Sequence, residues 1–435
     1  MDRRTFISLS TLLPFFGFGK LIGCLSKNSN NSIFNQKLAT DSKNIIDLHN
    51  SLKYRIISEE GLRMSDGFKV PGLADGMGSF LINDKIVLVR NHEIVPEHGI
   101  QKGPFQNPDS QIKLLGKKHY DNNAIGGTTN IVLDKVSKRV LKEYLSLSGT
   151  HQNCAGGITP WGTWLSCEEK VNKKIKNQPS HGYVFEVDPR NPSLNVPNPL
   201  KKLGRFNHEA IAFDRFSNAY LTEDRSNGLI YKFIPKTSNN LKNGELFALS
   251  IRGITDARNW NSSLIKSNKT YIADWVKIED YDPEHDTVRE EGMIKGATPF
   301  ARPEGIIAGG NSIYICCTSG GSLRRGQIWK INPTASKESS IELWYEVQDK
   351  ASLNMPDNIT IAPWGDLIVC EDNSDRNRLW GITSRGKPYL IAQNSYSSSE
   401  FAGVCFSPEE NSMFINLQSN GLTLLIDGNW NEVAT

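Results

Sequence analysis

The chain has 435 residues, of which 38% are hydrophobic and 22% charged, and this composition excludes a polytopic membrane protein and a wholly disordered chain. Its length leaves room for two ordinary domains or for one large β-architecture. The 50 basic and 47 acidic residues give a net charge of +3, and the basic residues gather only in short pairs such as Lys173–Lys174. No nucleic-acid partner is therefore expected.

The N-terminal residues 1–24 have the pattern of an export signal rather than of a folded element. Arg3 and Arg4 precede an apolar stretch, Phe6–Phe18, that is too short to cross a hydrocarbon core of ~30 Å comfortably. Paired arginines before such a stretch resemble a twin-arginine signal. The alternative is an ordinary basic signal peptide. Either way, the sequence predicts a protein that is exported to the periplasm or the cell surface.

The segment Leu21–Cys24 resembles a bacterial lipobox, which predicts a lipid anchor at Cys24 as the protein's membrane contact. The alternative is an unrelated cysteine. Residues 25–52, which contain a stretch rich in asparagine, serine and lysine, are expected to form a flexible tether. The remaining residues 53–435 are expected to form a single catalytic domain.

Short apolar runs separated by glycine, asparagine, aspartate and proline fill this domain and predict many β-strands. Six segments share one pattern, in which a polar residue, an apolar strand, a tight turn and a second apolar strand lead to a polar end. These segments begin at Asp75, Cys154, Glu209, Glu304, Asp357 and Glu400. The repeat predicts an all-β fold, a six-bladed β-propeller with inserted loops and short decorations. Val95–Asn123 and Pro235–Phe300 are the expected insertions.

The spacing within the repeat predicts where its polar residues meet. Fourteen positions separate Cys154 from Glu168, Glu209 from Glu223, Glu304 from Thr318, and Asp357 from Glu371. In a hairpin the start of one strand and the end of the next lie at the same edge. We therefore expect these side chains to converge at one mouth of the propeller channel. The alternative is that each is a solvated residue at a strand end.

Carboxylates gathered in this way need a counter-charge, because two of them ~5 Å apart repel by about 3 kcal/mol at an effective dielectric near 20. Arg302 is the obvious cation within the motifs, so bound metal ions are expected. An oxygen-rich cluster suits Ca²⁺, and a thiolate among carboxylates points to a transition metal such as iron. Cys154 lies in a polar, glycine-rich segment, whereas four other cysteines lie in apolar runs and are expected in the core: Cys167, Cys316, Cys370 and Cys405.

Three histidines near the motifs, His92, His151 and His208, fit either a metal-ligating or a structural role. The motifs themselves resemble the PhoX family of alkaline phosphatases, in order from about Gly61 to Gly428. The resemblance rests on these segments: Arg90–Glu93, Gly126–Asn130, Asn153–Glu169, Asn207–Glu209, Thr222–Asp224, Arg302–Gly305 and Cys370–Asp372. It implies a six-bladed propeller with a di-ferric, oxo-bridged centre and calcium ions at the channel mouth, and hydrolysis of phosphate monoesters.

The resemblance also implies roles for individual residues. Fe³⁺ would be bound by the thiolate of Cys154 and by carboxylates of Glu209 and Glu304, with Asp357 as a further ligand. Arg302 and Asn130 would contact the phosphate. Ca²⁺ would be bound by four other carboxylates: Glu93, Glu168, Glu223 and Glu371.

The predicted function is that of a metal-dependent phosphomonoesterase, a monomer that acts on small-molecule phosphate esters. Two alternatives stay open at this point. One is a calcium-dependent lactonase or phosphodiesterase on the same scaffold, and the other is a non-enzymatic propeller that binds a surface glycan or a protein.

Overall fold

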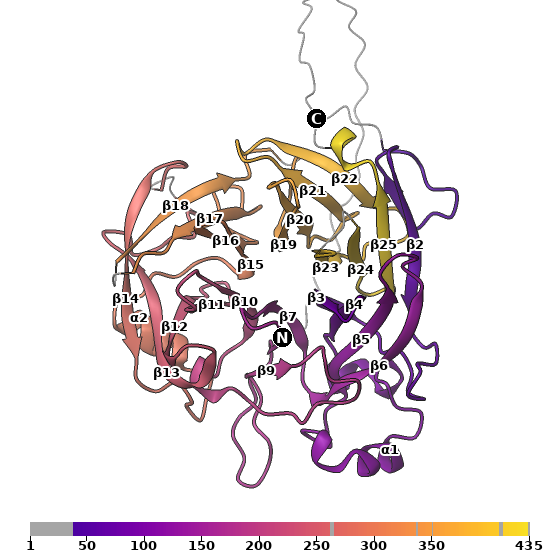
Figure 1. Cartoon of the computed structure of the whole chain (residues 1–435). Helices are drawn as coiled ribbons and strands as arrows, with labels where there is room; N and C mark the ends of the chain where they lie inside the picture. The colour runs from indigo at the N-terminus through magenta and orange to yellow at the C-terminus, as the bar shows by residue number, and fades with distance from the viewer. Residues whose placement is uncertain (1–37, 262–264, 336–337, 350, 409–411, 434–435) are drawn as a thin grey trace, which may run out of the picture. The chain divides into compact units, whose positions relative to one another are not determined.

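The computed structural model describes residues 38–261, 265–335, 338–349, 351–408 and 412–433. The predicted signal and the cysteine of the predicted lipobox lie outside these residues. The described chain is all-β and propeller-like, with five sheets arranged in a ring (Figure 1). A cavity lined by several of these sheets lies in the central channel of the ring. No helix among the described residues is long and apolar enough to cross a membrane.

Four of the sheets have three to five strands. The first contains β3 (Ala74–Ile82), β4 (Lys85–His92), β5 (Gly126–Asp134) and β6 (Val140–Thr150). The second contains β7 (Asn153–Ile158), β8 (Trp164–Glu168) and β9 (Val184–Val187). The third runs in the order β1 (Ile46–Leu48), β22 (Pro388–Asn394), β21 (Arg378–Ile382), β20 (Leu367–Glu371) and β19 (Pro356–Ile361). The fourth runs in the order β2 (Leu52–Glu59), β25 (Leu422–Gly428), β24 (Met413–Leu417) and β23 (Phe401–Phe406).

The fifth sheet has nine strands and corrects the expectation of six separate blades. Its first half contains β10 (His208–Phe213), β11 (Ala219–Glu223), β12 (Ile230–Thr237) and β13 (Asn240–Ile251). Its second half contains β15 (Pro303–Gly309), β16 (Ser312–Cys317), β17 (Gln327–Asn332) and β18 (Ser339–Glu346). Strand β14 (Thr270–Ile278) pairs with both β13 and β18 and so joins the two halves at their outer edges. Strands β13 and β14 lie in the segment expected as an insertion, Pro235–Phe300, and are part of the sheet.

The helices are short. The α-helices are α1 (Pro108–Leu115) and α2 (Val288–Ile294), and the 3₁₀ helices are η1 (Pro96–His98), η2 (Ile100–Lys102), η3 (Gly116–Lys118), η4 (Lys201–Leu203) and η5 (Trp430–Glu432). Because α1 and η1 to η3 lie between β4 and β5, the expected insertion at Val95–Asn123 is a strand-free excursion from the first sheet.

Strands from the two ends of the described chain close the arrangement. Strand β2 pairs antiparallel with β25, with Leu52 opposite Gly428, and the two lie side by side in Figure 1. Strand β1 pairs in the same way with β22. Pairing satisfies the backbone groups that an open sheet edge would leave free. These strands also differ from the expected tether over residues 25–52, since its described part contains β1 and the first residue of β2.

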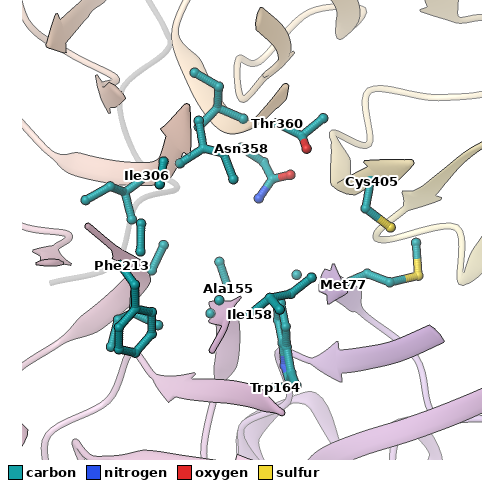
Figure 2. A pocket seen from close by; sticks show the side chains of 18 of the residues that line it. Met77, Ala155, Ile158, Trp164, Phe213, Ile306, Asn358, Thr360 and Cys405 are labelled. Carbon is teal, nitrogen blue, oxygen red and sulfur yellow. The ribbon is translucent and has the colours of Figure 1, made fainter. Parts of the chain in front are cut away.

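Six inner strands enclose the channel, in the order β3, β7, β10, β15, β19 and β23, and each contacts the next around the ring (Figure 1). A cavity of about 340 Å³ lies between them. Its wall is mostly apolar and takes side chains from every inner strand, among them Met77, Ile158, Phe213, Ile306 and Cys405 (Figure 2). At one end, the cavity is lined by Gly76 and Ala155, which directly follow Asp75 and Cys154 in the chain.

Apolar side chains between neighbouring sheets form the core. Trp329 and Phe300 are fully buried between the halves of the nine-stranded sheet, with ring centroids 5.3 Å apart in an edge-to-face arrangement. Burying a large apolar side chain stabilises the fold by roughly 1.5–3 kcal/mol. The four cysteines that the sequence assigns to the core are buried free thiols, as predicted: Cys167, Cys316, Cys370 and Cys405.

Candidate metal centre

The second residue of five inner strands carries a side chain that can bind a metal ion. These residues are Asp75 of β3, Cys154 of β7, Glu209 of β10, Glu304 of β15 and Asp357 of β19. In each strand the pairing register shifts directly after the first residue, as a β-bulge. A bulge bends the strand and re-aims its side chains. The repeated bulge is therefore the local feature that brings these five side chains to one end of the channel.

A second row of acids comes from the strands that pair with the inner ones. Glu93, Glu169, Asp224 and Asp372 each directly follow the last residue of β4, β8, β11 or β20. Those last residues pair with the first residues of the inner strands, so the two rows lie side by side. With Glu400, which precedes β23, the rows form what we call the acidic cluster: Asp75, Glu93, Cys154, Glu169, Glu209, Asp224, Glu304, Asp357, Asp372 and Glu400.

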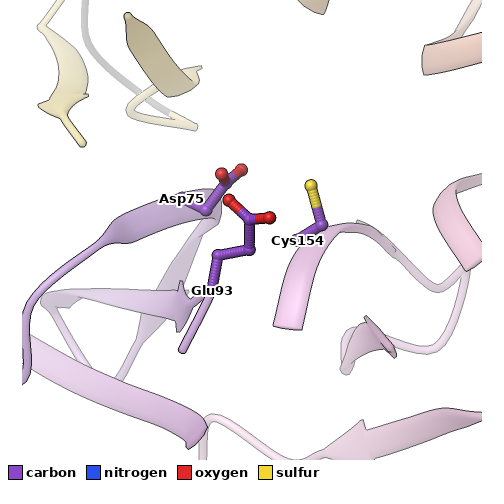
Figure 3. Close-up of side chains that lie close together, drawn as sticks. All are labelled: Asp75, Glu93 and Cys154. Atoms are coloured by element: carbon purple, nitrogen blue, oxygen red, sulfur yellow. The ribbon is translucent and has the colours of Figure 1, made fainter. Parts of the chain in front are cut away.

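Three groups within the acidic cluster have ligand atoms within 4.8 Å of one another. Cys154 belongs to two of them, one with Asp75 and Glu93 and one with Glu169 and Glu209. Figure 3 shows the Cys154 sulfur and the carboxylates of Asp75 and Glu93 directed toward a common space. The Cys154 thiol donates to Glu209 Oε1 at 3.2 Å. The third group contains oxygen ligands alone: Glu304, Asp357 and Asp372.

Glycines next to the ligand residues allow neighbouring inner strands to approach closely. A Cβ atom on Gly76 would lie 2.5 Å from the Cα of Ala155, and one on Gly305 would lie 2.3 Å from the carbonyl oxygen of Asp357. Real Cβ atoms do not come this close to backbone, so each position needs glycine for steric reasons. In the pairs Asp75–Gly76 and Glu304–Gly305, the acid is a candidate ligand. The glycine after it lets the neighbouring inner strand, with its own candidate ligand, come close.

The electrostatics of the cluster calls for bound cations. Burial and the neighbouring acids raise the pKa of the Cys154 thiol and of the Glu209 and Glu169 carboxyls. The cluster holds nine carboxyl groups and one thiol, and among the described residues Arg302 is the cation that forms ion pairs with it. Metal ions would remove this imbalance, and a donor set of carboxylates with one sulfur fits them. The residues present therefore fit a metal centre.

Arg302 lies inside the cluster, as predicted. Its Nε donates to Asp224 Oδ1 at 2.9 Å, its Nη atoms lie 3.4 Å from Asp372 Oδ2, and its guanidinium also forms an ion pair with Glu304. These acids raise the pKa of Arg302 even though burial opposes its charge. The backbone of Arg302 has a φ of 51°, a conformation that costs a non-glycine residue energy and is common at functional sites.

The structure does not bring all the predicted ligands into the cluster. Glu93, Cys154, Glu209, Glu304 and Asp357 do meet there. The carboxylates of Glu168, Glu223 and Glu371 are instead fully buried and hydrogen-bonded to residues outside the cluster. The acid that faces the channel is in each case the next residue along the chain.

Each of these three buried carboxylates accepts hydrogen bonds from a cationic or ionisable partner and from backbone N–H groups. Glu168 accepts from His181 Nδ1 at 2.7 Å and from the N–H of Gly182 at 2.9 Å. Glu223 accepts from Arg289 Nη1 at 2.6 Å and from the N–H of Leu229 at 3.2 Å. Glu371 accepts from Arg378 Nε and Nη2, both at 2.9 Å, and from the N–H of Asn354 at 2.8 Å. These contacts make the three acids supports of the cluster.

The structure does not place Asn130 in the acidic cluster, and its expected role as a phosphate contact stays a prediction. It is fully buried in the middle of β5, where it pairs with Val89 and donates to the Tyr144 hydroxyl at 3.1 Å. Strand β5 is two strands removed from the inner strand of its sheet. The short glycine-rich motif identifies this residue in the sequence. It does not indicate whether the residue lies on the inner strand of its sheet or on a strand farther from the channel.

Two amides at the cluster were not identified from the sequence. Gln152 Nε2 donates to Glu93 Oε1 at 3.0 Å and to Glu169 Oε2 at 2.8 Å. Gln418 Nε2 donates to Asp75 Oδ2 at 2.7 Å and to Glu93 Oε2 at 2.8 Å. Each amide therefore holds two carboxylates together. Gln418 ends a repeat segment at the position that an acid takes in other segments. This position in the repeat is the sequence feature that could have identified Gln418 as a residue of the site.

The three histidines near the motifs have structural contacts. His92 is bonded to the Gly72 carbonyl oxygen and to Thr129 Oγ1, both at 2.9 Å, and burial lowers its pKa. His208 is bonded to the Gly204 carbonyl oxygen at 3.0 Å, and burial lowers its pKa to about 3. The ring of His151 packs edge-on against His181, with centroids 4.4 Å apart.

Comparison with known proteins extends this picture. A sequence model of alkaline phosphatase PhoX matches residues 34–421. Among solved structures, Pseudomonas fluorescens PhoX in complex with vanadate, a transition state analogue, is 18% identical, with a TM-score of 0.68 over 91% of this chain and 98% of that chain. A gluconolactonase from Xanthomonas campestris is 8% identical, with a TM-score of 0.47 over 88% of this chain and 91% of that chain. A search of the curated proteins found no match.

The structural likeness, at 18% sequence identity, supports the propeller fold, and the match to the family model supports membership of the family. The matched residues 34–421 include all ten members of the acidic cluster, together with Arg302 and both bridging glutamines. The chain belongs to the alkaline phosphatase PhoX family and is a metal-dependent phosphatase.

Proposed function

We propose that this phosphatase hydrolyses small phosphate monoesters at the channel mouth, and that the acidic cluster holds iron and calcium ions there. The observation that carries the proposal is the charge imbalance of the cluster, in which nine carboxyl groups and a thiol face the single guanidinium of Arg302 among the described residues. Such an assembly is stable as ionised groups only when cations bind to it.

Ligand chemistry supports a division between the groups. We assign iron to the two groups that share Cys154, because a thiolate is a soft ligand that suits a transition metal. Calcium is assigned to the group of Glu304, Asp357 and Asp372, because Ca²⁺ prefers oxygen ligands alone. This assignment places Glu93 on the iron side, and Glu304 and Asp357 on the calcium side, which reverses the roles that the family resemblance implied for these three residues.

The chain's own residues then act on the substrate through position and charge. Bound metal ions would supply counter-charge and Lewis acidity for phosphoryl transfer. Arg302 offers parallel N–H donors to the phosphoryl oxygens, whose negative charge spreads as the transition state forms. Its contacts with Asp224 and Asp372 hold the guanidinium at the mouth. Gln152 and Gln418 keep neighbouring carboxylates paired.

Three further assignments complete the proposal. The nine-stranded sheet is best counted as two blades, which with the other four sheets makes a six-bladed propeller. Export by the twin-arginine route and a lipid anchor at Cys24 both concern residues outside the described chain. The twin-arginine route suits an enzyme that folds and takes up its metal ions before export. We also propose that the enzyme acts as a monomer.

The proposal is tested by elemental analysis of the purified protein together with turnover of a chromogenic phosphomonoester. Iron and calcium in stoichiometric amounts are expected, with activity lost on metal removal and restored by adding both ions. Turnover that survives complete metal removal would contradict the proposal. So would a preparation that is active with neither iron nor calcium bound.

Two cysteine variants sharpen this test. Cys154→Ala removes the sulfur from two groups of the cluster and is expected to lose iron and most activity. Cys405→Ala is the matched control, since Cys405 is a buried free thiol of β23 that lines the channel cavity instead. Equal iron content in the two variants would remove the assignment of iron to Cys154.

A further inference from the structure

A second cavity, of about 320 Å³, lies on the nine-stranded sheet away from the channel mouth. Its wall includes Phe216 and Asn218 of the turn between β10 and β11, and Lys232, Phe247 and Trp275 of β12, β13 and β14. The β10–β11 turn is at the opposite end of that hairpin from the His208–Glu223 pair, which marks the metal-binding end. The acidic cluster and this cavity are therefore separate sites.

The strand register places one amino group among aromatic rings. Lys232 pairs with Tyr220 on one side and with Phe247 on the other, so the three side chains share a face of the sheet. Lys232 is only 3% exposed. Its Nζ lies 5.5 Å from the centroid of the Tyr220 ring and 5.4 Å from that of the Trp275 ring.

This buried amino group has no hydrogen-bond acceptor or ion-pair partner among the described residues, and its contacts there are the two rings. Asp214 favours its charge from a distance, but burial outweighs Asp214 and lowers the pKa of Lys232. The oxygens of Asp214 already accept from Asn218 and Tyr220. A buried cation without an acceptor is costly, so Lys232 is a donor that lacks a partner.

The same wall contains a second donor without a partner. The indole Nε1 of Trp275 is buried and has no acceptor among the described residues. The guanidinium of Arg215 lies 4.9 Å from the centroid of the Phe216 ring and adds a second positive charge near the cavity. Two unsatisfied donors, a positive local charge and aromatic walls are complementary to an anion that carries an apolar body.

We propose that this cavity binds a small aromatic carboxylate, whose oxygens accept from Lys232 Nζ and Trp275 Nε1 and whose ring packs between Phe216 and Phe247. The volume is near the lower end of the ~300–1,000 Å³ typical of small-molecule sites, so the ligand is of single-ring size. Two donors match the two oxygens of a carboxylate, whereas a phosphate dianion offers three acceptor oxygens and calls for more donors.

The test is a calorimetric titration of the metal-loaded enzyme with benzoate, and with benzamide as the neutral analogue. Saturable binding of benzoate and none of benzamide is expected. Lys232→Met should weaken benzoate binding ten-fold or more, since a hydrogen bond to a charged group is lost. Trp275→Phe should weaken it several-fold. Lys277→Met is the control, because Lys277 also lies on this sheet but pairs with Glu245.

The variants stay informative if one of them misfolds, because each removes a different donor. Lys232→Met is expected to keep or raise the melting temperature, since it removes an unpaired buried charge, and Trp275→Phe keeps the aromatic wall. Equal binding of benzamide, no saturable binding, or unchanged affinity in Lys232→Met would overturn the proposal. Inhibition of phosphatase turnover that persists in Lys232→Met would place benzoate at the metal centre and would also overturn it.

Discussion

Glu168 and Glu169 are adjacent in the chain, yet their carboxylates lie in different surroundings: one is buried in the protein, and the other belongs to the acidic cluster at the channel mouth. Glu168 is fully buried in its sheet and bonded to His181, whereas Glu169 reaches the channel, where it lies with Cys154 and Glu209. The same division separates Glu223 from Asp224 and Glu371 from Asp372. Consecutive residues of a strand point to opposite faces, so each acidic pair supplies one support and one candidate ligand.

Isosteric variants of this pair should separate the two roles. Glu168→Gln removes the charge that pairs with His181 and is expected to cost about 3–5 kcal/mol of folding stability. Glu169→Gln removes a carboxyl group whose ionisation burial and the neighbouring acids oppose, so the metal-free protein should gain about 1–3 kcal/mol while iron retention falls. Urea unfolding and metal analysis of both variants check this. The division of roles fails if Glu169→Gln destabilises the metal-free protein as strongly as Glu168→Gln does.

The amide of Gln418 holds Asp75 and Glu93 together, and its loss should loosen one iron-binding group. Gln418→Leu is expected to lower iron affinity by roughly 10- to 100-fold, the usual effect of removing a partner that orients metal ligands. Competition with a chelator measures this affinity. Ser419→Ala is the neighbouring control. Ser419 donates a hydrogen bond to Ser399 Oγ through its backbone N–H, which the substitution keeps. Equal iron affinity in wild type and Gln418→Leu would show that the amide has no positioning role.

Substitution of Arg302 tests its contact with the substrate. Arg302→Lys keeps a positive charge but loses the parallel donors of the guanidinium, so kcat/KM for a phosphomonoester should fall by about 10- to 100-fold. Metal content should change much less, since the charge is kept. Arg225→Lys is the control at a nearby arginine, which pairs with Asp286 outside the cluster. A matching loss in both variants would indicate a general effect on folding.

Gly305 provides a steric test of how the ligands are brought together. In Gly305→Ala the new Cβ would overlap the carbonyl oxygen of Asp357, so β15 and β19 must separate at the site. Calcium retention and activity are expected to fall together. Gly365→Ala controls for backbone strain alone, because Gly365 has a φ of 95° with no atom near its missing Cβ. Gly365→Ala should cost roughly 1 kcal/mol and leave metal content unchanged.

The repeat in the sequence was sufficient to predict the all-β propeller and the convergence of Cys154, Glu209, Glu304 and Asp357, because strand and hairpin geometry fix which residues share an edge. It did not predict that β14 would join two blades, since a strand that pairs with both neighbours has no special pattern of its own. It also selected Glu168 rather than Glu169. A bulge shifts the strand pairing by one residue. The place of the bulge depends on backbone geometry, which cannot be read from the spacing of the acids in the sequence.

The final prediction concerns pH. His181 is fully buried between Glu168 and Asp121, at 2.7 and 3.0 Å, and it packs against the rings of His151 and Tyr120. Burial opposes the charge of its imidazolium, but the two carboxylates outweigh burial and raise the pKa of His181 to about 9. An unfolded histidine has a pKa near 6.5, so the folded state binds this proton more tightly.

The sign of the effect follows from this difference. Below pH ~6.5 both states carry the proton and the ion pairs contribute fully. Between pH ~6.5 and ~9 the contribution is progressively lost, because the unfolded chain has released its proton and folding must take one up from an increasingly basic solution. The loss is about 3 kcal/mol for a difference of this size. Urea unfolding across this range should show it in the wild type and not in His181→Gln. His285→Gln, at an exposed histidine, should follow the wild type. Parallel curves for wild type and His181→Gln would mean that His181 is not the group that titrates.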